Sequence, residues 1–260
     1  MKAIRIYAPG DETVMKFEDV AEPTPGAGQA TVKLDAIGVN FIDIYFRQGL
    51  YKAPENPYGI GMEGAGIVAA VGEGVTHLKV GDRVAFAMQR GSYAEMLNVP
   101  AWMLVPVPHA MDSRTAASLM LQGMTVHYLT HDSFSLKKGD TCVVHAAAGG
   151  LGLMLVQVAK MKGATVVGTA SSAARQATAK AAGADVVCGY DDFVAKAKEV
   201  SGGKGVDVVY DSVGATTFMP SLDCLRPRGT MVTFGNASGP VPAIEPLLLN
   251  QKGSLFLTRP

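Results

Sequence analysis

The stretch His145-Ala-Ala-Ala-Gly-Gly-Leu-Gly152 decides the fold of this chain. An apolar strand predicted over Thr141–Ala146 leads into this glycine turn, and the apolar run Leu151–Met161 has the length of a helix. Aligned with the dinucleotide fingerprint G-x-G-x-x-G, the small positions are Ala147, Gly149 and Gly152. The start of the following helix offers N–H groups to a pyrophosphate. Taken alone, the cluster also fits a tight strand-to-helix turn without a ligand.

The residues after the glycine turn alternate between strands and helices. Alanine-rich helical patterns cover Ala173–Ala182 and Asp192–Ser201. With the strand before the turn, the pattern predicts six parallel strands joined by right-handed crossovers, which is a doubly wound α/β domain. The five later strands are predicted at Ala164–Thr169, Asp185–Tyr190, Val206–Asp211, Gly229–Gly235 and Ser254–Arg259.

The first 110 residues or so have a different character, with short strands interrupted by glycine and proline. This pattern predicts a barrel or a sandwich. Asp112 and Ser113 can cap a helix that acts as the hinge between two domains, and Gly123 can interrupt it. We expect the ligand site in the cleft between the two halves. The strands are predicted at Lys2–Tyr7, Met15–Val20, Ala30–Ile37, Gly66–Val71, Arg83–Met88, Tyr93–Val99 and Met103–Val105.

The composition is that of an ordinary soluble globular protein, with 48% hydrophobic and 18% charged residues among 260. Lysine plus arginine equals aspartate plus glutamate, at 23 each, so nucleic acid is not an expected partner. Cys142, Cys188 and Cys224 are expected in the core, and an odd number of thiols favours a reducing compartment. Met1–Tyr7 resembles a strand rather than a secretion signal, and no run of about 18 apolar residues occurs. We therefore expect a cytoplasmic protein.

Several motifs occur in a fixed order from end to end of the chain, at Gly38–Tyr45, Gly61–Val68, Val80–Val84, His145–Gly152, Tyr210–Gly214, Phe234–Gly239 and Asn250–Leu255. Together they resemble the zinc-independent quinone oxidoreductase branch, which is zeta-crystallin-like, of the medium-chain dehydrogenase/reductase superfamily. The resemblance implies a GroES-like catalytic domain over residues 1–123, an NADPH-binding Rossmann domain over residues 124–260, and reduction of quinones by NADPH without metal or flavin.

The absence of zinc is also expected from the residues themselves. Zinc-dependent relatives carry cysteine where this chain has Asn40 and histidine where it has Met62. Neither an amide nor a thioether is a good zinc ligand. None of the five histidines has metal-like spacing, and we expect all of them in the core or on the surface. They are His77, His109, His127, His131 and His145.

The resemblance places four residues around the nicotinamide and the substrate: Asn40, Asp43, Tyr45 and Tyr51. We expect Asn40 and Tyr45 to hold the nicotinamide and the acceptor. The phenols of Tyr45 and Tyr51 would donate hydrogen bonds to quinone oxygens, while Asp43 orients its neighbours. The alternative is that residues 41–46 are only the apolar face of a short helix.

The segment Thr169-Ala-Ser-Ser-Ala-Ala-Arg175 favours NADPH over NADH, because it lacks the acidic residue that holds a ribose 2′-hydroxyl. Arg175 is expected to bind the 2′-phosphate, assisted by Ser171, Ser172 and Tyr190. Alternatively, Arg175 is a solvated residue at a helix start. The resemblance adds further cofactor contacts at Thr125, Tyr128, Gly150, Leu151, Ser212, Phe234, Gly235, Asn236, Ala237, Phe256, Leu257 and Thr258.

Relatives continue beyond the position of Pro260, where this sequence stops. From this we expect lower stability than that of a longer relative and an exposed apolar edge around Leu255–Leu257. The resemblance also implies a homodimer joined through the edge Ser254–Arg259.

Three functions remain open on the sequence. The first is an NADPH:quinone oxidoreductase, and the second is an NADPH-dependent reductase of α,β-unsaturated carbonyls. The third is an NADPH-binding protein with little turnover, in a crystallin-like or RNA-binding role.

Overall fold

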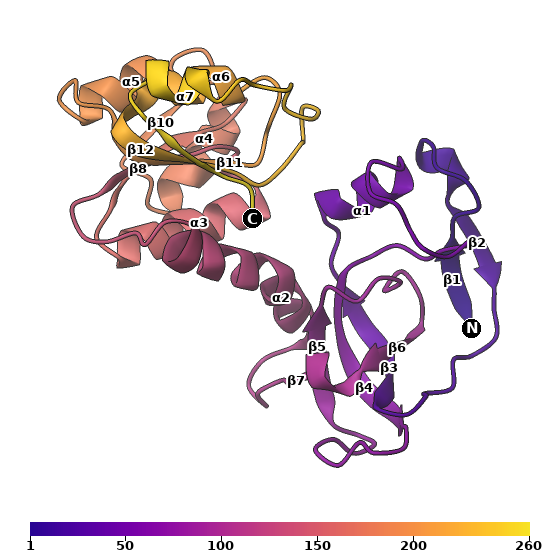
Figure 1. The fold of residues 1–260 in the computed structure, drawn as a ribbon. Helices are drawn as coiled ribbons and strands as arrows, with labels where there is room; N and C mark the ends of the chain where they lie inside the picture. The colour runs from indigo at the N-terminus through magenta and orange to yellow at the C-terminus, as the bar shows by residue number, and fades with distance from the viewer. The chain divides into compact units, whose positions relative to one another are not determined.

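The computed structural model describes residues 1–260. The chain forms two compact units, Met1–Leu121 and Gln122–Pro260. Figure 1 gives the ribbon and the labels of its elements. The boundary between the units falls inside a helix, and the predicted domain boundary between residues 123 and 124 stays a prediction.

The second unit contains the predicted parallel sheet of six strands, in the order β10-β9-β8-β11-β12-β13. Figure 1 shows helices on both faces of this sheet, so the doubly wound arrangement is confirmed. The strands are β8 (Thr141–Val144), β9 (Thr165–Thr169), β10 (Val186–Cys188), β11 (Val206–Asp211), β12 (Leu225–Thr233) and β13 (Phe256–Thr258). The helices are α3 (Gly150–Met161), α4 (Ala173–Ala181), α5 (Phe193–Val200), α6 (Phe218–Cys224) and α7 (Leu247–Gln251).

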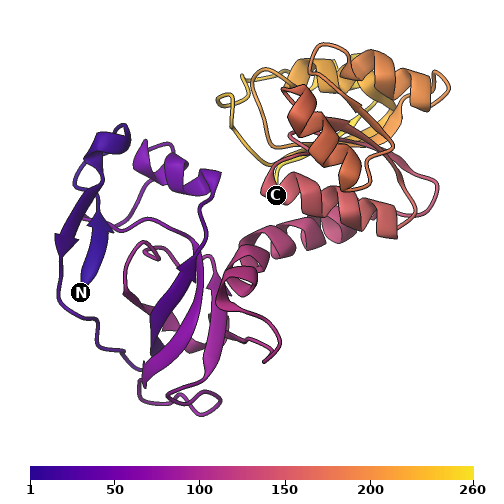
Figure 2. The ribbon, with the colours of Figure 1, turned by 180° about the vertical axis from the view of Figure 1, so that it is seen from behind.

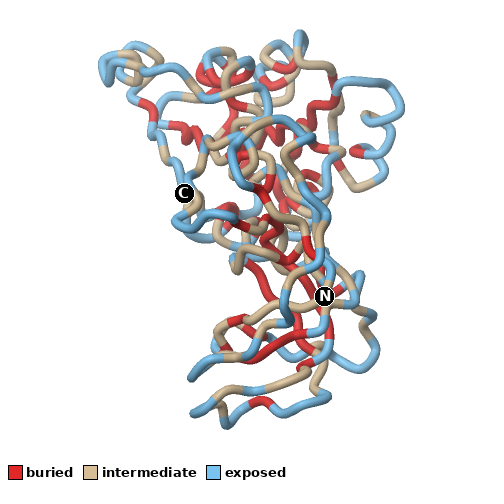
Figure 3. Tube along the Cα trace, turned by 90° about the vertical axis from the view of Figure 1, so that its right-hand side faces the viewer, coloured by how far each residue is buried: buried red, intermediate tan, exposed pale blue.

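Alternation along the buried strands builds a separate core on each face of this sheet. On β8, Cys142 and Val144 pack in one cluster with α3 and α4, while Val143 packs in the other with α5 and α6. Successive side chains of a strand point to opposite faces, so an apolar run is required when both faces are covered. Figure 3 shows buried residues in the interior of the trace and exposed residues along its outer loops.

The first unit is rich in β-structure, as predicted. Its antiparallel sheet has the order β6-β3-β4-β5-β7, and β1 pairs with β2. Figure 2 shows helix α1 beside this β1–β2 pair, where Phe46 packs with Ile4 and Ile6. The elements are β1 (Lys2–Arg5), η1 (Glu12–Val14), β2 (Lys16–Asp19), β3 (Gln29–Ile37), α1 (Phe41–Arg47), β4 (Glu63–Val71), β5 (Arg83–Ala87), β6 (Met96–Pro100), η2 (Ala101–Met103) and β7 (Val105–Pro106).

Two predictions about local structure are wrong. The strand expected at Met103–Val105 starts only at Val105, because Met103 ends the 3₁₀ turn η2 that follows Pro100 and Leu104 caps that turn. Gly123 does not interrupt helix α2 (Ser113–Tyr128), which continues into the π-helical turn η3 (Leu129–Ser133). A glycine in a helix interior costs only about 1 kcal/mol, and the burial of the following turns offsets it.

Other expectations about burial are confirmed, with one exception. The three cysteines are buried and unpaired, and burial raises the pKa of the Cys142 and Cys224 thiols to about 12. Phe256 and Leu257 are 54% and 37% exposed, but Leu255 is buried against the core and does not belong to the exposed edge. No helix has the length and apolar character needed to cross a membrane.

His145 ties three elements of the second unit together. It is 1% exposed, with Nδ1 3.0 Å from the Thr169 hydroxyl and Nε2 2.8 Å from the Ser221 hydroxyl. The Ser221 hydroxyl itself donates to the Thr217 carbonyl, so Nε2–H must be the donor to Ser221. Nδ1 then accepts from Thr169, and the neutral ring satisfies both contacts. Burial lowers the pKa of His145 to about 4.

This burial predicts a loss of stability in acid. Between pH 6.5 and 4 the unfolded histidine takes up a proton and the folded one does not, so the free energy of unfolding falls as pH falls. For His145 the loss between pH 8 and pH 5 is roughly 2 kcal/mol. Urea unfolding of the wild type and of His145→Gln at pH 8 and pH 5 measures this loss. The contributions of all other titratable groups cancel when the changes in unfolding free energy of the two proteins are subtracted. Parallel pH dependence of the two proteins would contradict a buried neutral His145.

Candidate functional site

The glycine turn lies between β8 and α3, where the sequence predicts it. Gly149 is the N-cap of α3, in an extended conformation. A Cβ atom on Gly152 would overlap the carbonyl oxygen of Ala146 and lie 2.8 Å from Cα of Ala147. Only glycine therefore allows the first turn of α3 to pack this closely on the chain that leaves β8.

Ala147 occupies the first small position of the fingerprint because a glycine on the neighbouring strand leaves room for its methyl group. A Cβ atom on Gly168 would lie 2.9 Å from Cβ of Ala147. Ala147 is fully buried, and its N–H donates to the Thr169 carbonyl at 2.9 Å. Ala146 has a φ of +50°, which is rare for a residue with a side chain and marks the turn as strained.

The residues expected around the 2′-phosphate follow the adjacent strands β9 and β10. Ser172 caps α4 by accepting from the backbone N–H of Arg175 at 3.3 Å. Ser171, Ser172 and Arg175 are exposed, and the Arg175 guanidinium has no hydrogen bond or ion pair. Tyr190 stacks on His145 with ring centroids 6.0 Å apart. An unpaired cation with two exposed hydroxyls and no nearby carboxylate in its own segment can hold a phosphate.

The turn after β11 is ordered by a residue that the sequence did not single out. Asp211 is fully buried and accepts from the N–H groups of Val213 and Gly214 and from the Thr217 hydroxyl at 2.7, 3.1 and 2.8 Å. A Cβ atom on Gly235 would lie 2.7 Å from the carbonyl carbon of Ser212. These contacts bring Ser212 together with the segment Phe234–Ala237, as the expected cofactor contacts require.

The remaining expected cofactor contacts of the second unit lie on α2, α3 and β13. Tyr128, Leu151 and Phe234 pack against the same apolar cluster beneath the glycine turn. Thr125 lies one turn before Tyr128 on α2, and Thr258 pairs with Val232 at the end of β13. Most of the expected contacts thus follow the carboxyl ends of parallel strands, which is where doubly wound folds bind ligands.

In the first unit, Asn40 and Asp43 belong to one partly buried hydrogen-bonded group. Asn40 precedes α1, its Nδ2 donates to Glu63 at 2.7 Å, and its backbone N–H donates to Asp43 at 2.9 Å. The Tyr93 hydroxyl donates to the same oxygen of Asp43 at 2.9 Å. Met62 is buried beside this group, and no cluster of three or more His, Cys, Asp or Glu side chains is placed to bind a metal ion.

The charges of this group are costly to bury. Burial raises the pKa of the Asp43 carboxyl, and the hydrogen bonds from Asn40 and Tyr93 partly oppose it. Burial also raises the pKa of Glu63, and the nearby Asp43 charge adds to the effect. Burial and Asp43 raise the pKa of Tyr93 above its usual range. Because Asp43 already accepts from two donors, the geometry favours a role in orienting its neighbours.

Tyr45 and Tyr51 are brought together as expected. Their rings lie 5.4 Å apart in an edge arrangement, and the Tyr51 N–H donates to the Tyr45 carbonyl at 3.1 Å. Phe41 is 56% exposed, whereas Tyr45 and Asp43 are buried, so the buried face of α1 is not purely apolar.

Sequence reasoning missed Glu63, Tyr93 and Asp211 as residues of the site. A signal was present for Glu63, which is the lone carboxylate in an otherwise small or apolar strand, whereas β11 carries Asp207 as well as Asp211. Nothing in the local sequence marks Tyr93, whose partner Asp43 is 50 residues away.

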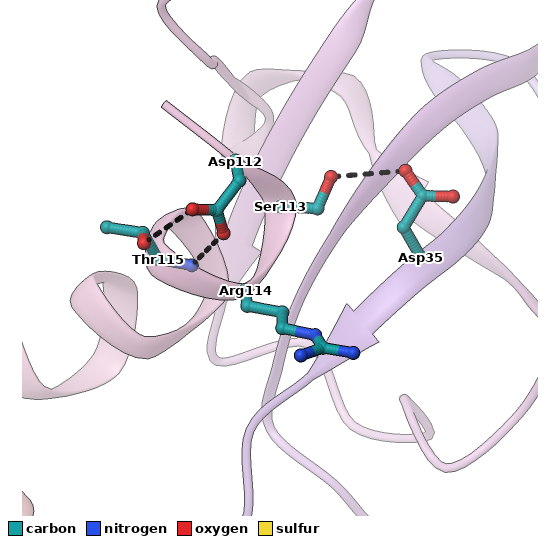
Figure 4. A pocket seen from close by; sticks show the side chains of 5 residues that line it. All are labelled: Asp35, Asp112, Ser113, Arg114 and Thr115. Carbon is teal, nitrogen blue, oxygen red and sulfur yellow. Dashed lines mark hydrogen bonds between the residues drawn. The ribbon is translucent and has the colours of Figure 1, made fainter. Parts of the chain in front are cut away.

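A separate open hollow of about 610 Å³ lies at the start of α2 and contains none of the expected site residues (Figure 4). Ser113 donates to Asp35 at 3.1 Å, and Thr115 donates to Asp112 through its N–H and its hydroxyl. The polar groups of Asp35, Ser113, Asp112 and Thr115 therefore satisfy one another, and the Arg114 side chain also lines the hollow.

Comparison with known proteins agrees with both halves of the structure. Residues 26–109 match the alcohol dehydrogenase GroES-like domain, and residues 150–258 match the family described as zinc-binding dehydrogenase. The chain is 45% identical to a quinone oxidoreductase of Pseudomonas aeruginosa over 100% of its own length and 81% of that protein. It is 42% identical to a 2-haloacrylate reductase of a Burkholderia species, over 98% of this chain and 79% of the relative.

Among solved structures, the Escherichia coli quinone oxidoreductase complexed with NADPH superposes with a TM-score of 0.97 at 44% identity, over 100% of this chain and 81% of that one. With the matched domains in the same order, these similarities show that the chain belongs to the zinc-independent quinone oxidoreductase branch of the medium-chain dehydrogenase/reductase superfamily.

Proposed function

We propose that this protein reduces quinones with NADPH, without metal or flavin. The observation that carries the proposal is the glycine turn at Ala147–Gly152, followed by α3 and flanked by the unpaired cation Arg175. The similarity to quinone oxidoreductases, one of them complexed with NADPH, supports the same activity.

The residues of the second unit fit NADPH. The closely packed glycine turn leaves the first N–H groups of α3 for the pyrophosphate. Arg175, with Ser171, Ser172 and Tyr190, would hold the 2′-phosphate. Thr125, Tyr128, Ser212, the segment Phe234–Ala237 and the strand residues Phe256–Thr258 would hold the nicotinamide half.

When bound, NADPH supplies the hydride for the reaction. Asn40 and Tyr45 would orient the nicotinamide and the acceptor, and the hydroxyls of Tyr45 and Tyr51 would donate hydrogen bonds to the oxygen on which negative charge develops. Asp43 would act by holding Asn40. In this proposal residues 1–123 are the catalytic domain and residues 124–260 the NADPH-binding domain. The protein is proposed to be cytoplasmic, since its cysteines are buried thiols.

A second activity, reduction of α,β-unsaturated carbonyls, is favoured by the similarity to the 2-haloacrylate reductase. The same hydroxyl donors can stabilise an enolate oxygen as well as a quinone oxygen. A role in NADPH binding with little turnover, crystallin-like or RNA-binding, remains the alternative from a different class.

Turnover of the purified chain decides between these functions. We expect NADPH oxidation that depends on 1,4-benzoquinone and proceeds with a higher kcat/KM than with 2-chloroacrylate. Faster reduction of the acrylate would assign the second activity. Thermal stabilisation by NADPH without oxidation by either acceptor would leave only the binding role.

The tyrosine pair tests the catalytic assignment. Replacing Tyr45→Phe and Tyr51→Phe together should lower kcat for the quinone roughly tenfold or more, because hydrogen bonds to the developing charge are lost. Tyr7→Phe is the matched control, since Tyr7 is an exposed phenol bonded to Glu18. Equal kcat for the double variant and the control would remove both tyrosines from the mechanism.

Cofactor choice depends on Arg175 in this proposal. Arg175→Ala should raise KM for NADPH about tenfold or more and leave KM for NADH nearly unchanged, because a charge-assisted hydrogen bond to phosphate is lost. Arg175→Lys keeps the charge and should retain part of the preference. An equal rise in both KM values would contradict the assignment.

We also propose a homodimer joined through β13. This strand is the edge of the sheet and carries the exposed Phe256 and Leu257. Light scattering should give twice the chain mass of 27.1 kDa. A single monomeric mass at high concentration would rule out this pairing.

A further inference from the structure

We propose that Glu63 is a positioning residue whose carboxylate fixes the direction of the Asn40 amide. The inference rests on the proposed function, which places Asn40 against the nicotinamide. Glu63 itself would touch neither cofactor nor substrate and would act only through Asn40.

Both carboxylate oxygens of Glu63 are used inside the first unit. The side chain is 1% exposed on β4, and Oε1 accepts from Nδ2 of Asn40 at 2.7 Å. Oε2 accepts from the backbone N–H of Leu121 on α2, also at 2.7 Å. Glu63 therefore joins the residue that begins α1 to the backbone of another helix.

The chemistry of the carboxylate determines what Asn40 presents. An ionised carboxylate only accepts hydrogen bonds, so it can face the amide NH₂ group but not the amide oxygen. With Nδ2 turned toward Glu63, the oxygen and nitrogen of the Asn40 side chain cannot exchange places. Meanwhile Asp43 holds the Asn40 backbone N–H, so two carboxylates fix two separate parts of one residue.

Burying this charge is costly, and a neutral glutamine would avoid the cost. Glutamine, however, has one accepting oxygen, and Glu63 accepts from two separate donors. In Glu63→Gln, either the Leu121 contact is lost or the Asn40 amide must turn over to offer its oxygen. The buried negative charge of Glu63 is thus explained by its two hydrogen bonds, because only a carboxylate can accept one at each of its two oxygens.

The backbone beside Glu63 leaves room for this arrangement. A Cβ atom on Gly38 would lie 2.5 Å from the carboxyl carbon of Glu63. The substitution Gly38→Ala would therefore push the carboxylate away from Asn40 without changing any polar group.

The test measures binding as well as turnover. NADPH dissociation constants from nicotinamide fluorescence, kcat with benzoquinone and the melting temperature without cofactor are compared for the wild type, Asn40→Ala, Glu63→Gln and Gly38→Ala. We expect all three variants to bind NADPH about tenfold more weakly or to lose about tenfold in kcat. If Glu63→Gln does not fold, the comparison of Gly38→Ala with the wild type tests the same contact between Glu63 and Asn40.

A reciprocal variant separates positioning from structural support. When Asn40→Asp is combined with Glu63→Gln, the introduced glutamine can donate to the introduced carboxylate and still accept from the Leu121 N–H. We expect this double variant to regain most of the melting temperature lost in Glu63→Gln, but not the NADPH affinity or kcat. Recovery of all three quantities would reduce Glu63 to structural support and overturn the proposal.

Two other outcomes are distinguishable. Wild-type affinity and kcat in Glu63→Gln and Gly38→Ala, with losses in Asn40→Ala, would overturn the role of Glu63 and leave the proposed site intact. If Asn40→Ala itself keeps the wild-type NADPH affinity and kcat, Asn40 has no role in the site. The proposed function of that residue would then fail together with the inference about Glu63.

Discussion

The contact of Gly152 with the backbone at Ala146 and Ala147 is the constraint on which the cofactor site depends. It lets α3 start directly above the end of β8, so that the helix start and the ends of the neighbouring strands meet at one edge of the sheet. Gly168 makes room for Ala147, and His145 then locks this strand end to β9 and α6. A larger side chain at Gly152 would push the start of α3 away from the end of β8. The expected cofactor contacts of the second unit require these two elements to be close.

The first unit depends on a different kind of interaction, because its expected site residues are polar, largely buried and held by hydrogen bonds. Asn40 is held by two carboxylates, and Asp43 is in turn held by Tyr93. The members of this network share hydrogen-bond partners, so a single substitution in it should affect more than one residue. Rigid hydrogen-bond donors and acceptors suit a reaction that has no metal ion to polarise its substrate.

Much of this could be predicted from the sequence, because strand alternation, the glycine turn and the Asp112 cap are local patterns. The long-range polar contacts could not be predicted in this way. Glu63 meets Asn40 across 23 residues and Leu121 across 58, and His145 meets Ser221 across 76. No periodicity marks such pairs, so a buried carboxylate is visible in the sequence while its partners are not.

A crystal structure of the chain with bound NADPH tests the central claim most directly. The account predicts the pyrophosphate on the N–H groups at the start of α3, beside Gly149–Gly152, and the 2′-phosphate within hydrogen-bond distance of the Arg175 guanidinium. Electron density for the cofactor away from this turn, or a 2′-phosphate without contact to Arg175, would contradict it.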